Sequence, residues 1–395
     1  MSSTSGSQKQ SEQYSCSNPC WKSTGYCKQH QQQAPEFRPN WKIRKDELLP
    51  ILDEFQLYSN SGINLGGLVD EYLGKNFEGT SKKLTGHTGG VSSICDLGDG
   101  RFASGAWDNT VCIWDLNKET KTKPVQILKG HTEDVNSVCA WDNGRYLASC
   151  SDDETIRIWK IDEYKSEYKS VQTLKLASVY SIGVLKENVV VSGSKDGKVC
   201  IWKPSEETMG TNANEQKQYK LAQTLDGHDD WVTSVCDLGD GRFASGSLDS
   251  KICIWKLNNT GEYGRVQELT GRYNGVTSVC KLGNNQLAST DGNSIWIWKG
   301  EGEDKLYKHV KILNADTRGR GTHRGLCALS GDRLASGYSE KIYIWELNAE
   351  DDWEYKQTLE PPQRDTLAFV FSLCQLDDDR LVSGSYQDHL VRVWL

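Results

Sequence analysis

The sequence predicts an all-β protein folded as a seven-bladed β-propeller, a closed ring of small sheets. An Ile-Trp or Val-Trp dipeptide closes the same short pattern seven times, at Trp114, Trp159, Trp202, Trp255, Trp298, Trp345 and Trp394. Successive tryptophans lie 43 to 53 residues apart, and such a period indicates an array of equivalent supersecondary units. Within each unit, short runs of alternating apolar and polar residues are separated by Gly and Asp turns, which indicates consecutive β-strands.

The repeats share polar residues as well as the tryptophan. Residues 91–114 and 232–255 are nearly superimposable. In blades 1, 2 and 4 a Gly-His pair precedes the first strand, a Ser lies ten residues before the Trp and an Asp six before it. These sets are His87, Ser104, Asp108 and Trp114; His131, Ser149, Asp153 and Trp159; and His228, Ser245, Asp249 and Trp255.

This repeat resembles the WD-repeat family over residues 79–395. The resemblance implies a propeller that holds a partner. A catalytic Ser-His-Asp triad is the alternative interpretation of the three polar sets. Three copies at equivalent blade positions favour instead a structural network that satisfies buried polar groups.

The order of the strands predicts how the ring closes. An outer-strand candidate precedes every blade, the first of them at Ser81–Leu84 and others at Val171–Leu174 and Val266–Leu269. The sequence given stops at Leu395, directly after the last Trp, so blade 7 lacks a fourth strand of its own. We therefore expect the N-terminal strand Ser81–Leu84 to complete blade 7, leaving only short, protected edges.

Departures from the repeat gather in one sector. Blades 3, 5, 6 and 7 replace the Gly-His histidine, and blades 6 and 7 have longer loops there, at 317–324 and 362–369. Aromatic and Arg side chains collect on this loop-rich face, and these residue types are enriched at binding hot spots. The predicted partner-binding residues are Trp107, Trp231, Tyr273, Arg318, Arg320, Arg324, Tyr338, Arg364, Phe369 and Tyr386. Arginines on an otherwise acidic molecule (net charge −8) favour an acidic or phosphorylated protein segment.

Amino-acid composition indicates the cellular compartment of the protein. No apolar run reaches eighteen residues and the first ten residues carry no hydrophobic segment, so neither a membrane span nor a secretory signal is expected. Six of the ten propeller cysteines end the first strand of their blade, too far apart for disulfides. Free thiols in such number indicate the cytoplasm or the nucleus.

Two regions precede the propeller. Residues 1–40 form a polar tail in which Cys16, Cys20, Cys27 and His30 supply three thiolates and an imidazole, a sufficient ligand set for one structural zinc ion. A disordered tail with incidental thiols is the other interpretation. Residues 41–76 have leucines at helical spacing and resemble the SAP module, a nucleic-acid-binding helical hairpin. A hairpin that packs on the propeller or on a partner is the alternative, since few cations are present for phosphate binding.

The predicted function is a non-catalytic scaffold or adaptor that presents a propeller face to a protein or peptide. We find no nucleophile–base pair in the divergent sector, because His323 has no evident Ser or Cys partner, so no catalytic residue is assigned. Two alternatives stay open. One is an adaptor tethered to nucleic acid through residues 1–76, and the other is the substrate receptor of a ubiquitin ligase. We expect the propeller itself to be monomeric.

Overall fold

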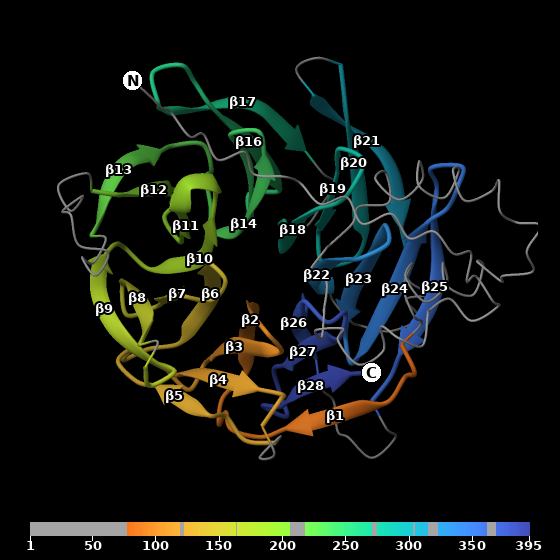
Figure 1. The fold of residues 1–395 in the computed structure, drawn as a ribbon. Coiled ribbons are helices and arrows are strands. Elements are labelled where there is room, and N and C mark those ends of the chain that lie inside the picture. The colour runs from red at the N-terminus through yellow and green to blue at the C-terminus, as the bar shows by residue number, and fades with distance from the viewer. Residues whose placement is uncertain are drawn as a thin grey trace, which may run out of the picture. The chain divides into compact units, whose positions relative to one another are not determined.

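The computed structural model describes residues 77–118, 122–162, 164–205, 218–270, 275–302, 305–314, 323–361 and 369–395. Seven four-stranded antiparallel sheets follow one another around a ring, as Figure 1 shows. The seven-bladed propeller predicted from the repeat is therefore confirmed. The predicted zinc ligands and the helical hairpin of 41–76 lie outside the described residues.

The strands of each blade follow the chain from the centre of the ring to its rim. Blade 1 holds β2 (Val91–Gly98), β3 (Arg101–Ala106), β4 (Val111–Asp115) and β5 (Gln126–Leu128). Blade 2 holds β6 (Val135–Trp141), β7 (Tyr146–Ser151), β8 (Thr155–Asp162) and β9 (Glu167–Lys175). Blade 3 holds β10 (Val179–Val184), the 3-10 turn η2 (Lys186–Asn188), β11 (Val190–Ser194), β12 (Val199–Pro204) and β13 (Tyr219–Leu225). Blade 4 holds β14 (Val232–Gly239), β15 (Arg242–Ser247), β16 (Lys251–Leu257) and β17 (Tyr263–Thr270).

The last three blades continue the pattern. Blade 5 holds β18 (Ser278–Lys281), β19 (Gln286–Thr290), β20 (Ile295–Glu301) and β21 (Leu306–Leu313). Blade 6 holds β22 (His323–Leu329), β23 (Arg333–Tyr338), β24 (Lys341–Leu347) and β25 (Trp353–Leu359). Blade 7 holds β26 (Val370–Gln375), β27 (Leu381–Ser385), β28 (Val391–Trp394) and, at its rim, β1 (Ser81–Leu84).

The two ends of the described chain meet in blade 7. Strand β1 pairs antiparallel with β28, in a register that places Ser81 opposite Trp394 and Leu84 opposite Val391. Backbone hydrogen bonds extend the pairing outward, from the Leu395 N–H to the Thr80 carbonyl at 3.2 Å and from the Glu78 N–H to the Leu395 carbonyl at 2.5 Å. The predicted closure of the ring by Ser81–Leu84 is confirmed.

The apolar core lies between neighbouring blades. Each repeat tryptophan is buried, and Trp114, Trp255 and Trp394 are at most 2% exposed. The Phe102 ring stacks on Trp114 with centroids 5.9 Å apart, and Phe243 stacks on Trp255 at 6.0 Å. Because each large ring removes 150–250 Å² of surface from water, on the order of the areas usual for Phe and Trp, the blade-to-blade contacts carry most of the hydrophobic stabilisation.

A repeated polar clasp joins adjacent blades at the rim. The Gln172 side chain on β9 donates to the Tyr219 carbonyl and accepts from the Tyr219 N–H on β13, both at 2.8 Å. Gln126, Gln223 and Gln267 clasp Tyr168, Tyr263 and Tyr307 in the same way. Gln357 donates to the Phe77 carbonyl at 2.6 Å, and Lys311 replaces Gln against the Trp353 carbonyl at 2.7 Å. The clasp thus secures six junctions between outer strands in the described residues.

Among the described residues, no helix has the length and apolarity needed to cross a lipid bilayer. The ten described cysteines are all free thiols. In six blades the first strand continues one to three residues beyond its cysteine, as β2 does from Cys95 to Gly98, so these residues lie within the strand rather than at its end.

Candidate functional site

The predicted polar network forms as one directional chain of hydrogen bonds in blade 1. The Trp114 indole N–H donates to Ser104 Oγ at 2.7 Å, and Ser104 Oγ lies 2.7 Å from His87 Nε2. His87 Nδ1 lies 2.9 Å from Asp108 Oδ2. Because the Asp108 carboxylate can only accept, the proton of a neutral imidazole sits on Nδ1, and Nε2 then accepts the Ser104 hydroxyl.

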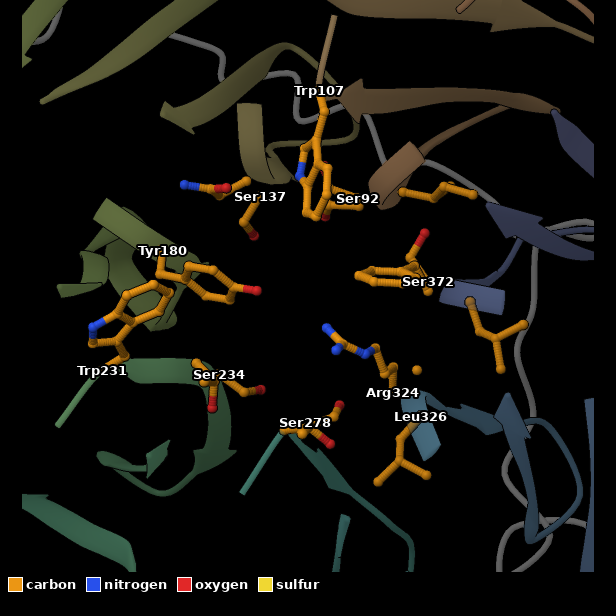
Figure 2. A pocket seen from close by; sticks show the side chains of 18 of the residues that line it. Ser92, Trp107, Ser137, Tyr180, Trp231, Ser234, Ser278, Arg324, Leu326 and Ser372 are labelled. Atoms are coloured by element: carbon orange, nitrogen blue, oxygen red, sulfur yellow. The ribbon is translucent and has the colours of Figure 1, made fainter. Parts of the chain in front are cut away.

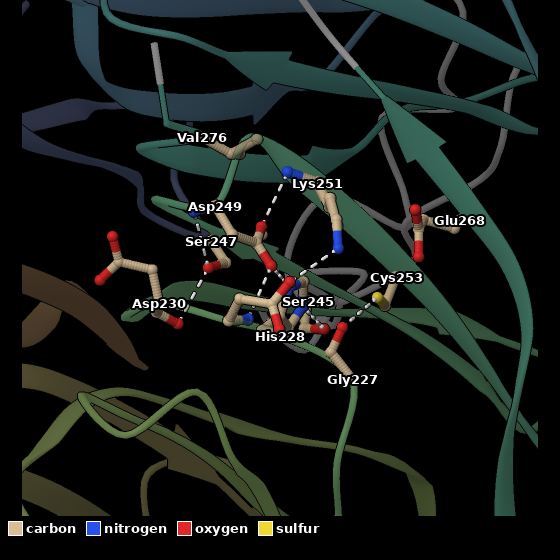
Figure 3. A network of polar contacts seen from close by, with 12 residues as sticks. Gly227, His228, Asp230, Ser245, Ser247, Asp249, Lys251, Cys253, Glu268 and Val276 are labelled. Atoms are coloured by element: carbon tan, nitrogen blue, oxygen red, sulfur yellow. Dashed lines mark hydrogen bonds and ion pairs between the residues drawn. The ribbon is translucent and has the colours of Figure 1, made fainter.

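Blades 2 and 4 repeat this chain. His131 lies 2.8 Å from both Asp153 and Ser149, and His228 lies 3.0 Å from Asp249 and 2.8 Å from Ser245, as Figure 3 shows for blade 4. Burial lowers the pKa of the His131 imidazole, although Asp153 opposes the shift. Burial alone would raise the pKa of Asp108, but the hydrogen bond and charge of His87 hold it well below its ordinary value.

The serine hydroxyls of the network are enclosed by the side chains that they contact. Ser104, Ser149 and Ser245 are each 0% exposed, and each hydroxyl is enclosed between a tryptophan and a histidine, so no substrate reaches the oxygen. The Trp–Ser hydrogen bond occurs in all seven blades, including the four that lack the histidine. Its recurrence matches the role of pinning the third strand to the second.

In two of the four blades that lack the histidine, another side chain binds the Asp of the turn. In blade 5 the Trp296 indole donates to Asp291 Oδ2 at 3.0 Å. In blade 7 Arg392 pairs with Asp388. Both donors occupy the third-strand position that holds Cys112 in blade 1, directly before the Ile-Trp or Val-Trp dipeptide. In blades 5 and 7 the carboxylate of the turn therefore keeps a side-chain partner although the histidine is absent.

The propeller cysteines lie in environments that disfavour the thiolate form. Burial raises the pKa of the Cys236 thiol to about 11 and that of Cys112 to about 12. Cys236 Sγ accepts the backbone N–H of Lys281 in the next blade at 3.2 Å, and Cys280 Sγ accepts that of Ala328 at the same distance. These thiols stay protonated at neutral pH and join neighbouring first strands.

One cavity opens at the mouth of the central channel, with a volume of about 390 Å³. First strands of blades all around the ring line it, through residues such as Ser92, Ser137, Tyr180, Ser234, Ser278 and Arg324 (Figure 2). We call it the channel mouth. It lies at the end of the blades from which the first strands start, next to the loop-rich face predicted to bind a partner.

A β-bulge turns one residue of most first strands towards the channel mouth. The register shifts after Val91, Val135, Val179, Val232 and Val370, so the next residue is unpaired with the second strand. Bulges commonly redirect a side chain next to functional sites. In blades 1, 2 and 4 this residue is small and polar and bonds the next blade. The Ser92 hydroxyl donates to the Val135 carbonyl at 2.5 Å, and Thr233 donates to Val276 at 2.5 Å.

In blades 3, 6 and 7 a larger residue stands at this bulge position. The bulge carries Tyr180 in blade 3 and Phe371 in blade 7. In blade 6 the shift runs from His323 to Leu326, so the bulge is enlarged and holds Arg324 and Gly325. A Cβ added to Gly325 would lie 3.2 Å from the Phe371 carbonyl oxygen, so the bulge packs closely against the next blade. At the channel mouth, these three large side chains stand in place of small residues that hydrogen-bond to the next blade.

Aromatic rings of blades 7 and 1 form a group with Arg324. Trp107 meets Phe371 and Tyr386 edge-on, with centroids 5.8 and 4.8 Å apart, and the centroids of Phe371 and Tyr386 are 5.1 Å apart. The Arg324 guanidinium carbon lies 4.4 Å from the Phe371 centroid. We call Trp107, Phe371 and Tyr386 the aromatic group.

Gly90 makes room for this packing. A Cβ added there would lie 2.4 Å from the Tyr386 ring, a distance that real Cβ contacts do not reach. The glycine therefore fixes how closely blades 7 and 1 approach beneath the aromatic group.

The opposite side of the channel mouth is acidic and charge-paired. Lys195 Nζ lies 2.8 Å from Asp152 Oδ2 and 4.6 Å from the centroid of Trp231, which in turn packs against Tyr180 at 5.7 Å. Burial, together with the charges of Asp152 and Glu133, raises the pKa of Asp134. Negative charge is thus concentrated on blade 2, away from Arg324.

The structure brings together part of the predicted partner-binding set. Trp107, Trp231 and Arg324 line one cavity, and Tyr386 packs against Trp107. Tyr338 instead lies inside blade 6, 6% exposed and 6.3 Å from the Tyr343 ring, so it is not presented to a partner. Phe369 is half-buried, and its carbonyl accepts the Tyr386 N–H at 3.0 Å. The remaining predicted residues, Tyr273, Arg318, Arg320 and Arg364, lie outside the described residues.

Sequence reasoning missed Tyr180 and Phe371. Both look like core residues in an alternating strand. The available signal was the column of equivalent positions Ser92, Asn136, Thr233 and Thr277, in which a large aromatic side chain is out of place.

Fold and polar network together define a propeller built from repeats that join the third strand to the second through Trp and Ser in every blade, with His and Asp added in blades 1, 2 and 4. The family model described as "WD domain, G-beta repeat" matches residues 79–115, 122–160, 169–203 and 219–256. The chain is 30% identical over 258 residues to small ribosomal subunit protein RACK1 of Caenorhabditis elegans, covering 62% of this chain and 70% of that protein. The chain belongs to the WD-repeat family.

Other relatives are matched over a smaller share of their length. Elongator complex protein 2 of Drosophila melanogaster is 32% identical over 198 residues, which are 46% of this chain and 25% of that protein. Cell division control protein 4 of Saccharomyces cerevisiae is 27% identical over 273 residues, which are 57% of this chain and 30% of that protein. The chain thus spans only about a quarter to a third of these two relatives.

Proposed function

We propose that the protein is a non-catalytic interaction scaffold that binds a protein segment on the loop-rich face, across the channel mouth. The observation that carries this proposal is the aromatic group with Arg324. Three blades contribute rings and a guanidinium to one partly exposed surface, and two of these side chains, Phe371 and Arg324, replace the small polar bulge residues of blades 1, 2 and 4. Trp, Tyr and Arg are the side chains that most often dominate binding energy at protein interfaces.

Charge supports an acidic or phosphorylated segment as the ligand. No carboxylate among the described residues lies within ion-pair distance of Arg324, whereas Lys195 on the other side is already paired with Asp152. The predicted Arg318, Arg320 and Arg364 would add to the same sector. WD-repeat relatives include a protein of the small ribosomal subunit and a protein of the Elongator complex, which agrees with a scaffold role in the cytoplasm or nucleus.

Partner recovery from cell extract tests the proposal. The full chain carrying Arg320→Glu and Arg324→Glu is expected to lose the partner with little change in melting temperature, and a second form carrying Trp107→Ala and Tyr386→Ala is expected to lose it as well. Arg101→Glu is the matched control, since Arg101 starts β3 at the opposite end of blade 1. Unchanged recovery by both double variants, with loss on replacing Asp134 and Asp152 by Asn, would place the partner on the acidic side instead.

A further inference from the structure

The channel mouth contains two polar groups that point into the cavity and lack a counterpart in the described residues. The Arg324 guanidinium extends from blade 6, and the Tyr180 side chain from blade 3 directs its hydroxyl towards the same space (Figure 2). Neither group has a hydrogen bond or an ion pair to any described residue. Phe371 lies against the guanidinium, whose carbon is 4.4 Å from the ring centroid.

Both side chains occupy the bulge position that holds the ring together elsewhere. In blades 1, 2 and 4 that residue bonds the Val carbonyl of the next blade, at 2.5 Å from Ser92, 3.0 Å from Asn136 and 2.5 Å from Thr233. In blade 3 the bond passes to the following residue, since the Ser181 hydroxyl donates to the Val232 carbonyl at 3.0 Å. The junction is therefore kept while Tyr180 is released towards the cavity. Because Ser181 makes the hydrogen bond to blade 4, the Tyr180 side chain is left to face the channel.

We propose that Arg324 and Tyr180 form a carboxylate socket in the channel mouth, which takes one acidic side chain or the C-terminal carboxylate of the protein segment bound on this face. This inference rests on the proposed function and specifies its ligand. A guanidinium presents two parallel N–H groups to the two oxygens of a carboxylate, and the phenol O–H donates to a remaining lone pair. Stacking on Phe371 fixes the plane of the fork before the ligand arrives, which lowers the entropic cost of binding.

The charge around the socket favours a carboxylate over a phosphate. A phosphorylated side chain carries about −1.5 to −2 at neutral pH, whereas a carboxylate carries a single negative charge. Among the described residues lining the cavity, Arg324 is the one cation. Asp152 and Asp134 already place negative charge on the far side. Burial raises the pKa of Tyr180, the charge of Arg324 opposes that shift, and the charge of Asp152 adds to it. One arginine balances a monoanion and would leave excess negative charge beside a dianion.

An unbiased peptide selection tests the socket. A phage-displayed library of random linear peptides is selected against the full chain, and the selected peptides are resynthesised with amidated C-termini for affinity measurements. We expect one conserved Asp or Glu, whose replacement by the neutral amide weakens binding about 10-fold or more, the effect usual for a charge-assisted hydrogen bond. Peptides that bind only with a free C-terminal carboxylate would identify that group as the anion.

Variants then assign the effect to the two side chains. Arg324→Gln should remove the preference for the acidic peptide over its amide form. Arg324→Glu should instead favour peptides with Lys or Arg at that position, and Tyr180→Phe should weaken binding of the acidic peptide several-fold. Arg101→Gln, at the far end of blade 1, is the matched control and should leave the affinity unchanged. Melting temperatures of all variants should stay near that of the wild type, because neither side chain bonds another described blade.

Each outcome separates the socket from the wider proposal. Peptides that need Trp107 and Tyr386 but show no preference for acid over amide would overturn the socket and leave the scaffold proposal standing. Tighter binding of the same peptide with phosphoserine in place of the acid would overturn the carboxylate assignment. Failure to select any peptide, or peptides indifferent to Trp107→Ala and Tyr386→Ala, would overturn both.

Discussion

At the scale of single residues, burial disfavours the charged form of His131 and lowers its pKa, although Asp153 opposes the shift. In the neutral form of His131, Nδ1 donates to Asp153, and Nε2 accepts the hydroxyl of Ser149, whose oxygen accepts from Trp159 at 2.9 Å. Asp153 also accepts the Thr132 N–H at 3.1 Å and the Thr155 hydroxyl at 2.6 Å. The carboxylate therefore organises the turn on both of its oxygens, and the histidine connects that turn to the strand beneath it.

Replacing the Asp of the turn should lower the free energy of unfolding substantially only in blades that have all the Trp–Ser–His–Asp hydrogen bonds. We expect Asp153→Ala to lower the free energy of unfolding by about 1–3 kcal/mol, because it leaves a buried imidazole N–H and turn amides unpaired. Asp196→Ala is the matched control, since Asp196 occupies the same turn in blade 3 but is exposed and faces Ala177 in place of the histidine. Denaturant unfolding measures both, and equal losses would contradict the network interpretation.

Acid should destabilise the same network. The folded pKa of His131 lies below its ordinary value of 6.5, so the unfolded chain binds more protons as the pH falls through that value, and stability is lost. The pKa of Asp108 is also lowered, from 3.8, and its contribution is lost at still lower pH. We expect the free energy of unfolding to fall between pH 7 and pH 5, and to fall less steeply in His131→Gln. A wild-type protein that gains stability over that interval would rule out a neutral His131.

At the scale of strands, the rim clasp explains why the outer strands are longer than their apolar pattern indicates. The sequence predicts outer strands at 171–174 and 266–269, whereas the structure has β9 at Glu167–Lys175 and β17 at Tyr263–Thr270. The additional residues include the buried aromatic that the neighbouring Gln holds by its backbone. Their partner lies about forty residues away, so no local pattern reveals them.

The clasp is expected to contribute measurably to stability. Gln172→Ala removes two bonds to the Tyr219 backbone, and since Tyr219 is 2% exposed water does not easily replace them. We predict a loss of about 1–3 kcal/mol in the free energy of unfolding, the cost usual for unpaired buried groups. Thr173→Ala, on the same strand but exposed, should change it little. If the two substitutions prove equivalent in thermal and denaturant unfolding, the clasp adds nothing to the blade junction.

The candidate site shows a similar limit of sequence reasoning. Trp107, Arg324 and Tyr386 could be predicted because they flank turns and loops where the repeat is broken. The alternation along the strand does not reveal Tyr180 and Phe371, because a residue inside a first strand is expected to pack in the core, and only comparison with the equivalent positions of other blades shows that a large ring is unusual there. Their exposure to the channel follows from a bulge, and a one-residue register shift leaves no mark in the apolar pattern.

At the scale of the whole molecule, closure distinguishes this ring from an open array of repeats. In an open solenoid each repeat contacts only its neighbours, so damage at one end stays local. Here every blade has two neighbours, and the last junction depends on β1 and β28, which are far apart in sequence. Rim clasps, thiol contacts and bulge residues repeat at the junctions, so loosening one junction should weaken the restraint on the others.

Removal of residues 391–395 tests that cooperativity. The deletion takes away β28, leaves β1 without a partner and removes Trp394, which is 1% exposed between blades 6 and 7. We expect amide hydrogen exchange to accelerate not only in blade 7 but also in β15 of blade 4, across the ring. The matched comparison is Trp394→Phe, which keeps the β1–β28 pairing but loses the bond to Ser383, and whose faster exchange should stay within blades 6, 7 and 1. Wild-type protection of β15 in the truncated chain would show that the blades unfold independently, and that closure orders the ends without stabilising the ring as a unit.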